Sequence, residues 1–393
     1  MNNQVSHLPV VIIGAGVVGL SIARELATVP KFKDNIVVVD KARTVGDGQS
    51  GRNSGVLHAG IYYETGSLKA KLCVEGNRRI KEYAAAHDIP WAETGKLIVA
   101  TTSPEEAILE TYLQKALNNG LREGVEIELI SGREAIKRAP NIYCTAALYS
   151  KTTGIIDAAV YLKTLYQECQ EKNVAVLFGQ QIVHIRPHQT MMELDVKLLG
   201  ETTETYTTDL LINAAGLYAD TFARMINPTF PYRIIPTRGE YCTFSVTRAE
   251  LGINDLNIYP VPSTYETKGN KITSVGIHLT PTFEQDCQGK VQIGKTVLVG
   301  PTAKDVQKPD DFTIDRYPLS HFYERVKPFF PHLQKDDLSL GDTGIRARLQ
   351  DYNDFVIEKD LLFPQCINIV GSDSPFLTAS LMAGPYVKKL LGV

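Results

Sequence analysis

The hydrophobic pattern begins with a short apolar run that leads directly into three glycines. Val10–Ile13 is apolar at every position, as expected for a strand buried on both faces of a parallel sheet. Gly14, Gly16 and Gly19 follow with the spacing G-x-G-x-x-G, and apolar residues then recur at helical intervals from Leu20 to Ala27. The pattern predicts a strand, a tight turn and a helix whose N-terminal N–H groups can bind a pyrophosphate.

A second apolar run ends in an acid. Asn35–Asp40 reads N-I-V-V-V-D, which places Asp40 about 20 residues after Gly19. At that spacing a carboxylate accepts hydrogen bonds from ribose hydroxyls, and its charge disfavours a ribose 2′-phosphate. The glycines alone are weak evidence, but strand, turn, helix, strand and acid together predict a dinucleotide-binding domain of the Rossmann type.

Further strand-to-helix junctions predict where the parallel sheet continues. A loop rich in Gly, Ser and Asn spans 41–60 and is longer than an ordinary connection of about 2–6 residues, so we expect it to line a long cofactor. Asp209–Asn213 is a buried-type strand that runs into Ala214-Ala215-Gly216, where small residues indicate close backbone approach. Cys366–Val370 is another such strand, followed by a glycine and a predicted helix over 377–391.

The remaining pattern indicates a second domain. Helices are predicted from Ser67 as N-cap to about residue 86, from Ser103 as N-cap, and over 131–138. Strands alternate with Gly and Pro turns over 233–301, which predicts an antiparallel sheet. We therefore expect an α/β nucleotide-binding domain with a parallel central sheet and an inserted α+β substrate domain built on an antiparallel sheet. The predicted boundaries are 1–88, 150–226 and 337–393 for the first domain, and 89–149 and 227–336 for the second.

Composition narrows the classes of function. Apolar residues make up 44% and charged residues 22% of the 393 positions, as in a soluble globular protein. The net charge of −3 gives no electrostatic case for nucleic-acid binding. Six cysteines without a C-x-x-C pair predict reduced thiols in a cytoplasmic protein and no metal centre. No apolar run reaches the roughly 18 residues of a membrane-spanning helix, and the glycine motif begins too near Met1 to leave room for a transit peptide.

The order of these motifs resembles the FAD-dependent oxidoreductases of the D-amino-acid-oxidase type. The shared features are the glycine motif with its acid, G-Q-S-G-R-N-S-G from Gly48, A-A-G-L-Y-A-D from Ala214, and the strand, glycine and helix near the C-terminus. Within that superfamily, stretches along nearly the whole chain resemble the L-2-hydroxyglutarate dehydrogenase/oxidase family. These stretches are His58–Tyr63, Ser67–Cys73, Gly95–Ala100, Arg238–Tyr241, Ile258–Pro262, Gly276–His278 and Gly344–Ala347.

The resemblance implies a glutathione-reductase-like FAD-binding domain and FAD as the cofactor. It also implies oxidation of L-2-hydroxyglutarate, or a close 2-hydroxy acid, to the 2-oxo acid by hydride transfer to flavin N5. Two stretches depart from the family. Ala303–Phe312 reads A-K-D-V-Q-K-P-D-D-F instead of a more aromatic and basic sequence, which bears on substrate identity. Gly371 and Asp373 differ from the usual C-terminal motif, although Ser374-Pro375 matches it, which bears on flavin reactivity.

The same resemblance implies a set of cofactor-binding residues. The glycine motif and its acid would hold the ADP half of FAD, one strand residue would offer backbone contacts to adenine, and the last helix would follow the flavin edge. The full set is Gly14, Gly16, Val17, Val18, Gly19, Asp40, Lys41, Ser50, Asn53, Ser54, Val183, Ala215, Gly216, Gly344, Arg346, Gly371, Ser374, Pro375, Leu377 and Thr378.

Oxidation of a 2-hydroxy acid needs a cation for the carboxylate and a base for the hydroxyl proton. Arg346 is the predicted carboxylate clamp, because a guanidinium binds a carboxylate through two parallel hydrogen bonds. A structural ion pair with Asp342 or Asp354 is the alternative. His58, in a turn after the glycine-rich loop, and His278, in a strand, are candidate bases because imidazole titrates near neutral pH. A structural histidine is the alternative at each position.

Four further residues are candidate substrate-binding groups: Tyr62, Tyr63, Arg238 and Tyr241. Tyrosines in such places more often pack and make a single hydrogen bond. The aromatic run over 321–330 is either a peripheral contact with the inner face of a membrane or part of a buried helix.

Several functional alternatives stay open at the level of sequence. The electron acceptor is oxygen, a quinone or a transfer flavoprotein. The rival functions are a glycerol-3-phosphate-oxidising or an amine- or amino-acid-oxidising flavoenzyme of the same fold, a non-catalytic FAD-binding assembly factor, and an NAD-dependent dehydrogenase, which would be colourless.

Overall fold

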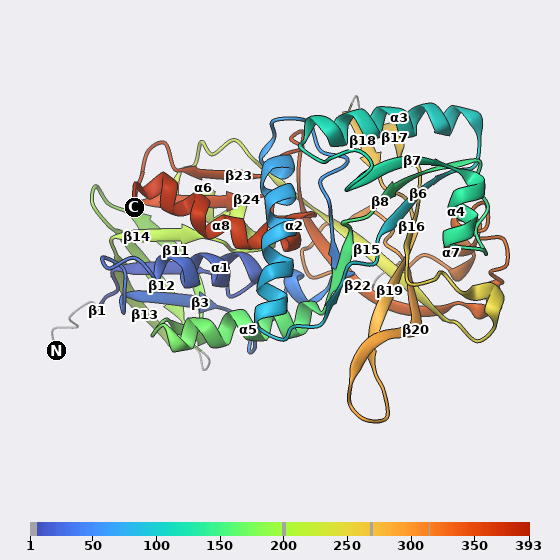
Figure 1. Cartoon of the computed structure of the whole chain (residues 1–393). Coiled ribbons are helices and arrows are strands. Elements are labelled where there is room, and N and C mark those ends of the chain that lie inside the picture. Colours follow the sequence, from blue (N-terminus) through green and yellow to red (C-terminus); the bar gives the residue numbers. More distant parts are fainter. Residues whose placement is uncertain (1–5, 199–201, 268–269, 314) are drawn as a thin grey trace. The chain divides into compact units, whose positions relative to one another are not determined.

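The chain folds into two compact units, each assembled from segments that are separated in the sequence (Figure 1). The computed structural model describes residues 6–198, 202–267, 270–313 and 315–393, and over 263–274 it describes the backbone alone. The first unit comprises Met1–Asn53, Ala158–Pro236 and Arg346–Val393, and the second comprises Ser54–Asp157 and Thr237–Ile345.

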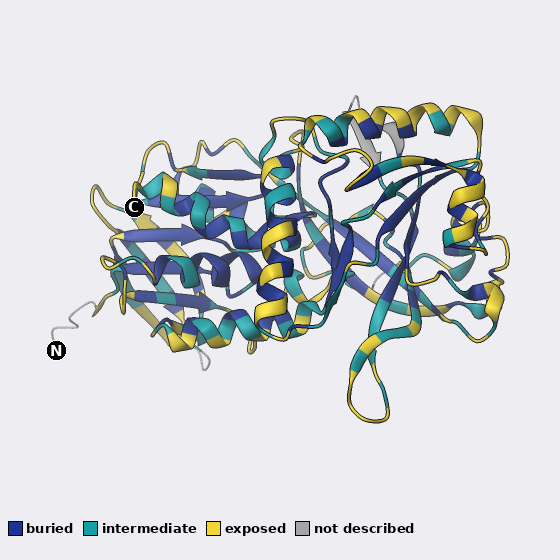
Figure 2. Cartoon of the chain, viewed as in Figure 1, coloured by how far each residue is buried: buried dark blue, intermediate teal, exposed yellow. Residues whose placement is uncertain are grey.

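A six-stranded sheet forms the centre of the first unit. Its strand order is β10-β3-β2-β14-β24-β23, and every pairing is parallel except that of β23 with β24. Strands β2, β14 and β24 are buried along their whole length, which accounts for their nearly continuous apolar sequences (Figure 2). The bounds are β2 (Val10–Ile13), β3 (Ile36–Asp40), β10 (Ala175–Phe178), β14 (Leu210–Asn213), β23 (Val356–Lys359) and β24 (Cys366–Val370).

Helices and a smaller sheet cover this central sheet. Helix α1 packs against α5 and α8, whereas α6 packs against β14, β24 and β11. The smaller sheet has the order β1-β13-β12-β11, and its apolar side chains share a core with those of β2 and β3. The bounds are α1 (Val17–Leu26), α5 (Ala158–Glu171), α6 (Ala219–Ile226), α8 (Phe376–Leu391), β1 (Ser6–His7), β11 (Gln181–Pro187), β12 (Met192–Lys197) and β13 (Thr203–Thr208), with 3-10 turns at η1 (Gln49–Gly51) and η2 (Gly216–Tyr218).

The second unit is built on a nine-stranded sheet of order β21-β15-β20-β19-β16-β6-β8-β7, with β22 also paired to β15. Strands β6 and β16 pair in parallel, and the neighbouring pairs β16–β19, β19–β20, β20–β15, β6–β8 and β8–β7 are antiparallel. The bounds are β6 (Lys96–Ala100), β7 (Ile127–Ser131), β8 (Ala146–Ser150), β15 (Ile234–Ser245), β16 (Asn257–Pro260), β19 (His278–Gln285), β20 (Val291–Gly300), β21 (Lys304–Asp305) and β22 (Ser339–Leu349). This unit also contains a hairpin of β17 (Ser263–Thr267) and β18 (Asn270–Ser274) and 3-10 turns at η3 (Ala249–Leu251) and η4 (Lys335–Asp337).

Side chains of this sheet enter two separate cores, one on each face. Along β6, Leu97 and Val99 belong to one core and Ile98 and Ala100 to the other, as the two-residue repeat of a strand requires. The first core includes side chains of α4 (Gly132–Arg138) and α7 (Leu319–Val326), and the second includes one face of α3 (Ser103–Asn118). The aromatic run over 321–330 contributes three buried phenylalanines to the first core, so those rings pack inside the unit.

The position of residues 54–88 differs from the predicted domain boundaries. We expected this segment in the nucleotide-binding domain, but it lies in the second unit. Its first strand, β4 (Val56–Leu57), and β5 (Trp91–Ala92) both pair with β9 (Gly154–Ile156). In α2 (Leu68–Ala86), the amide of Asn77 donates to the carbonyl oxygens of His58 and Thr152 at 3.0 and 3.1 Å. The pairing of β4 with β9 and the bond to Thr152 tie the segment to the second unit.

Helix caps explain where the predicted helices begin. Ser67 accepts a hydrogen bond from the N–H of Ala70 at 3.1 Å and caps α2 as predicted. Helix α3 begins one residue earlier than predicted, with Thr102 as N-cap, because Glu105 reaches back to accept from the N–H of Thr102 at 3.2 Å. None of the described helices is long and apolar enough to cross a membrane.

The cysteine side chains are all reduced thiols in the described chain. Five are buried, and burial raises the pKa of each; the five are Cys73, Cys144, Cys169, Cys242 and Cys366. The sixth, Cys287, is exposed in the turn between β19 and β20. No group of three or more His, Cys, Asp or Glu side chains in the described residues is arranged to hold a metal ion.

Candidate active site

The glycine turn of the first unit has the geometry of a phosphate-binding loop. Gly14 leaves β2 with φ +103°, a conformation that L side chains rarely adopt. A Cβ on Gly19 would lie 1.9 Å from the carbonyl oxygen of Gly14, so only glycine lets α1 start this close to the strand. A Cβ on Gly16 would lie 2.8 Å from Oγ of Ser50. Gly14 and Gly19 therefore have the turn and close-packing roles that the motif predicts, and the approach of a pyrophosphate at Gly16 stays a prediction.

Hydrogen bonds fasten the surrounding loops to this turn. Asp40, at the end of β3, accepts from the N–H of Ala15 at 2.7 Å and from the N–H of Ala42 at 2.8 Å. Each of its carboxylate oxygens keeps further acceptor capacity, which ribose hydroxyls can use. Oγ of Ser50 accepts from the N–H of Val17 at 3.1 Å, which brings the glycine-rich loop to the N-terminus of α1.

Two other features of the first unit leave polar groups available to a long nucleotide. The register of β11 with β12 skips Val183, so its peptide groups are outside the ladder, as a backbone contact to adenine requires. Gln49 donates to the carbonyl oxygen of Ser372 at 3.0 Å, while its buried Oε1 has no hydrogen-bond partner among the described residues. Gly216 has φ +56°, and its Cβ position is 3.3 Å from that Oε1. The residues present fit FAD.

Most of the other predicted cofactor residues lie in the first unit, in α1, in the loops after β3 and β14 and at the start of α8. Val17 and Val18 are buried in the first turn of α1, and the ammonium of Lys41 lies 3.5 Å from the ring centroid of Tyr218. Asn53 donates to the carbonyl oxygen of Ser50 at 2.5 Å. The remainder follow two junctions, with Ala215 at η2, Gly371 after β24 with φ +76°, and Ser374, Pro375, Leu377 and Thr378 at the beginning of α8. Ser54 and Gly344 belong to the second unit.

The second unit contains a buried polar cluster on one face of its sheet. Ile258 and Leu279 enter the first core, so their neighbours Tyr259 and His278 project from the opposite face, which Lys96 shares with Ile98. His278 is 3% exposed and Lys96 is 1% exposed. His58 lies close enough to both that their charges act on it. The fold thus brings His58 and His278, two candidates far apart in sequence, into one cluster.

His58 is held as a neutral imidazole. Its carbonyl oxygen accepts from the amide of Asn77 at 3.0 Å and from the thiol of Cys73 at 3.3 Å, which fixes the turn. Burial, followed by the positive charges of Lys96 and His278, lowers the pKa of His58 from 6.5 to about 3. At neutral pH the ring is therefore unprotonated and can accept a hydrogen bond.

His278 is oriented by two contacts. Its ring stacks on that of Tyr259, with centroids 3.7 Å apart and planes inclined by 18°. Its Nδ1 lies 3.1 Å from the carbonyl oxygen of Gly276. Because a carbonyl oxygen only accepts, Nδ1 carries the hydrogen, and Nε2 is the basic atom of the neutral ring.

Lys96 is the member of this cluster that the sequence analysis missed. Its Nζ lies 4.7 Å from the ring centroid of Tyr62 and 4.9 Å from that of Tyr259. Burial lowers its pKa from 10.5 to about 7, although the Cys73 thiol acts in the opposite direction. The sequence does contain a signal for Lys96, because a single lysine begins an otherwise apolar strand. A lysine is almost never fully buried unless its charge is paired.

The predicted tyrosines are placed differently from one another. Tyr62 is half-buried beside Lys96, and its buried Oη has no hydrogen-bond partner among the described residues. Tyr63 and Tyr241 are also half-buried. In each of these two, the carbonyl oxygen is used in the fold: that of Tyr63 accepts from Asn119 at 2.9 Å and that of Tyr241 from Arg316 at 3.3 Å.

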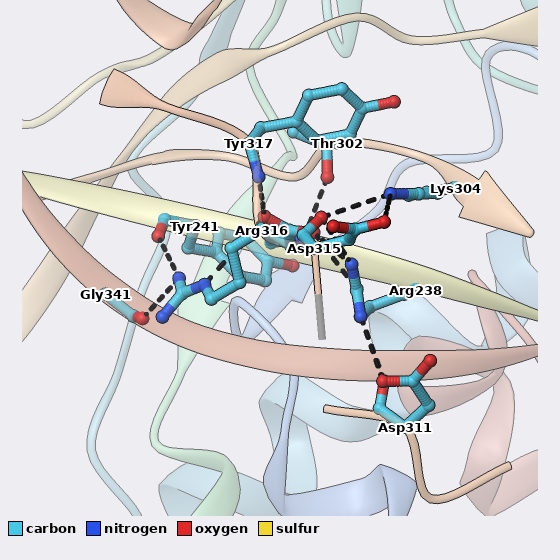
Figure 3. Close-up of polar contacts among 10 residues, drawn as sticks. Arg238, Tyr241, Thr302, Lys304, Asp311, Asp315, Arg316, Tyr317 and Gly341 are labelled. Atoms are coloured by element: carbon cyan, nitrogen blue, oxygen red, sulfur yellow. Dashed lines mark hydrogen bonds and ion pairs between the residues drawn. The ribbon is translucent and has the colours of Figure 1, made fainter. Parts of the chain in front are cut away.

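Arg238 lies in a buried ionic network (Figure 3). Its guanidinium donates to Glu240 at 3.0 Å, to the carboxylate of Asp311 at 3.1 Å and to the carbonyl oxygen of Asp315 at 3.0 Å. Arg238 and Glu240 are both fully buried, and Glu240 also accepts from the N–H of Tyr317 at 2.8 Å. All three guanidinium nitrogens have protein acceptors, so the geometry gives no support to the predicted substrate-binding role of Arg238, which stays a prediction.

Arg346, the predicted carboxylate clamp, lies in β22 and is half-buried. It belongs to the first unit, whereas His58 and His278 belong to the second. The predicted catalytic groups therefore come from both units, and the clamp role of Arg346 stays a prediction.

Residues 9–390 match the family described as FAD dependent oxidoreductase (DAO), and the chain belongs to this family. It is similar over most of its length to L-2-hydroxyglutarate dehydrogenases. It is 30% identical to the mitochondrial enzyme of Arabidopsis thaliana, over 96% of this chain and 82% of that protein, and 30% identical to the enzyme of Indibacter alkaliphilus, over 95% and 96%. The solved structure of dithionite-reduced L-α-glycerophosphate oxidase from Mycoplasma pneumoniae with FAD bound matches with a TM-score of 0.80 at 25% identity, covering 98% of this chain and 94% of that one.

Four predictions are confirmed by these comparisons. The fold is a Rossmann-type FAD-binding domain with a substrate domain, the cofactor is FAD, the protein is an FAD-dependent oxidoreductase, and the resemblance to L-2-hydroxyglutarate dehydrogenases covers nearly the whole chain.

Proposed function

We propose that this protein oxidises L-2-hydroxyglutarate to 2-oxoglutarate. The observation that carries the proposal is the cluster of His58, His278 and Lys96 on one face of the second unit's sheet, in a chain whose relatives are named L-2-hydroxyglutarate dehydrogenases. FAD, when bound, accepts the electrons and hydrogen that leave C2 of the substrate. The protein's own task is to bind the carboxylates and to take the hydroxyl proton.

The two imidazoles supply the proton acceptor. His278 offers Nε2, because its Nδ1 hydrogen is engaged by the carbonyl oxygen of Gly276. His58 is neutral at physiological pH because its pKa is lowered to about 3. A substrate carboxylate beside Lys96 offsets the positive charge that depresses this pKa and so makes His58 more basic when substrate is bound. Arg346 is proposed to bind the carboxylate next to C2 through a bidentate contact.

Anaerobic reduction of the bound FAD tests the proposal. Mixing the FAD-loaded protein with L-2-hydroxyglutarate should bleach the visible flavin absorbance, whereas the D enantiomer, as matched control, should leave it nearly unchanged. Bleaching by glycerol 3-phosphate or an amino acid, but not by L-2-hydroxyglutarate, would assign one of the rival oxidations. Bleaching by dithionite alone would indicate a non-catalytic FAD-binding protein.

The acceptor that re-oxidises the reduced flavin is a separate part of the proposal. Oxygen, a quinone and a transfer flavoprotein are the candidate acceptors, and re-oxidation rates of the reduced protein with each would separate them. A cytoplasmic location is supported by the buried reduced thiols. The aromatic run over 321–330 gives no support to a peripheral membrane contact, because its phenylalanines pack in the first core of the second unit.

A further inference from the structure

Among the described residues, Lys96 is a buried lysine without the charge partners that buried lysines usually have. Its side chain is 1% exposed and occupies the first position of a strand whose other residues are all apolar and buried. Removing an ammonium from water costs several kcal/mol unless an anion or hydrogen-bond acceptors compensate it. Such a residue therefore needs an explanation that packing does not provide.

The described surroundings of Lys96 contain no such compensation. Its contacts are the faces of Tyr62 and Tyr259, with Nζ to ring-centroid distances of 4.7 and 4.9 Å. Among the side chains that the structure describes, no carboxylate pairs with Nζ and no acceptor forms a hydrogen bond with it. Besides burial, which lowers the pKa of Lys96, the thiol of Cys73 acts on it and raises this pKa. His58, whose own pKa Lys96 lowers, is neutral in this environment.

The second buried lysine of this unit shows the contrast. Lys81 in α2 has Nζ 2.5 Å from a carboxylate oxygen of Glu93 and 2.6 Å from the carbonyl oxygen of Thr152. Lys81 thus has hydrogen-bond acceptors within the fold. The ammonium of Lys96, which lies beside two histidines, contacts only the faces of aromatic rings among the described side chains. Aromatic faces favour the charged form of an amine but do not neutralise it, so the arrangement is suited to an anion from outside.

We propose that Lys96 binds the substrate carboxylate remote from the reacting carbon and thereby selects dicarboxylates over monocarboxylates. The inference rests on the proposed oxidation of a 2-hydroxy dicarboxylate. Each carboxylate of a dianion needs its own compensating group, and Lys96 is the cation that the buried cluster of the second unit supplies. Oη of Tyr62, buried and without a hydrogen-bond partner among the described residues, donates to the same remote carboxylate.

Ligand binding to the oxidised, FAD-loaded protein tests this inference without turnover. Glutarate carries both carboxylates but no hydroxyl, and butyrate lacks the remote carboxylate. Lys96→Met should weaken glutarate binding by about 10- to 100-fold, the usual value of a charged hydrogen bond, and leave butyrate binding within about twofold. Lys81→Met, the matched control, should leave the ratio of the two affinities unchanged. Titration calorimetry measures both ligands on the same samples.

The proton balance of binding gives an independent readout. Because the pKa of free Lys96 is about 7, glutarate binding above that pH should take up a proton in the wild type. Calorimetry in buffers of different ionisation enthalpy should detect this uptake and find it absent in Lys96→Met. Lys96→Gln, neutral but polar, serves as a second variant if Lys96→Met unfolds.

The outcomes separate the two proposals. Equal loss of glutarate and butyrate binding in Lys96→Met would overturn the inference, since Lys96 would then serve the common carboxylate or the structure. Unchanged glutarate affinity, or no glutarate binding by the wild type, would also overturn it. If L-2-hydroxyglutarate fails to bleach the flavin of the wild type, the proposed oxidation itself is wrong, whatever the variants bind.

Discussion

At the scale of single residues, two buried basic groups of the second unit, Lys96 and His58, make the free energy of unfolding depend on pH. The pKa of Lys96 is about 10.5 in the unfolded chain and is lowered to about 7 in the folded protein. The unfolded state therefore binds more protons between these values, and the free energy of unfolding rises with pH across this window. His58 extends the trend to acid, because it is neutral down to about pH 3 when folded and protonates near 6.5 when unfolded.

Lys96→Met should remove the alkaline part of this dependence. We expect the variant to be more stable than the wild type at pH 7, by up to roughly 1.4 kcal/mol for each unit of the pKa shift it abolishes, and to match it near pH 10.5. Denaturant unfolding of the substrate-free protein at both pH values measures the difference. Lys81→Met should change stability at pH 7 by no more than about 1 kcal/mol, because Glu93 is half-exposed and keeps much of its hydration when the ammonium is removed. Parallel pH profiles of wild type and Lys96→Met would contradict the assignment.

At the scale of elements, two glycines of the β2–α1 junction have different roles, one in folding and the other in cofactor binding. A Cβ on Gly19 meets backbone, the carbonyl oxygen of Gly14, at 1.9 Å, and backbone cannot give way without moving α1. A Cβ on Gly16 meets only the side-chain hydroxyl of Ser50 at 2.8 Å. That hydroxyl can rotate, but the methyl group then occupies the space through which a pyrophosphate approaches.

Two alanine variants should distinguish these roles. Gly19→Ala should destabilise the FAD-free protein by more than about 2 kcal/mol, as overpacking at a rigid contact does. Gly16→Ala should unfold within about 1 kcal/mol of the wild type and yet bind FAD at least about tenfold more weakly. Thermal unfolding of FAD-free samples and titration of flavin fluorescence measure the two effects. A stable Gly19→Ala protein would show that α1 can shift.

At the scale of the whole molecule, neither unit is continuous in sequence. The central sheet of the first unit places β14, from 210–213, between β2 and β24, and its outer strand β10 comes from 175–178. A fragment ending at Asp157 retains the complete glycine motif but lacks four of the six strands of the central sheet: β10, β14, β23 and β24.

Such a 1–157 fragment should therefore fail to bind FAD despite carrying Gly14, Gly16, Gly19 and Asp40. We expect no cooperative unfolding transition of the first unit, because β2 and β3 alone bury too little apolar surface for a stable domain. Circular dichroism on heating and flavin fluorescence check this, with the full chain as control. A fragment that bound FAD tightly would mean that the motif folds locally.

Much of this architecture could be predicted, because parallel strands buried on both faces leave an unmistakable apolar run. This pattern predicts four strands of the central sheet, which the structure has at Val10–Ile13, Ile36–Asp40, Leu210–Asn213 and Cys366–Val370. The position of residues 54–88 was not predicted, since the apolar face of α2 does not reveal which unit it meets. The pairing of β4 with β9 and the bond from Asn77 to Thr152 place it in the second unit.

Within the candidate site, residue type alone could not separate binding groups from structural ones. Arg238 has the chemistry of a carboxylate clamp, but its acceptors include Asp311, far away in sequence, so only the fold shows that it is engaged. Lys96 does not stand out in the sequence, because Lys96–Ala100 has the pattern of a buried strand; the lysine at its first position is nevertheless the less expected residue.

Cys287 has a practical consequence that follows from its place at the β19–β20 turn. Thiol reagents attack the thiolate, and the other five cysteines are buried with raised pKa values. A maleimide dye or electrode linker added to the native protein will therefore attach at this turn, which gives a defined point of immobilisation without adding or removing a cysteine.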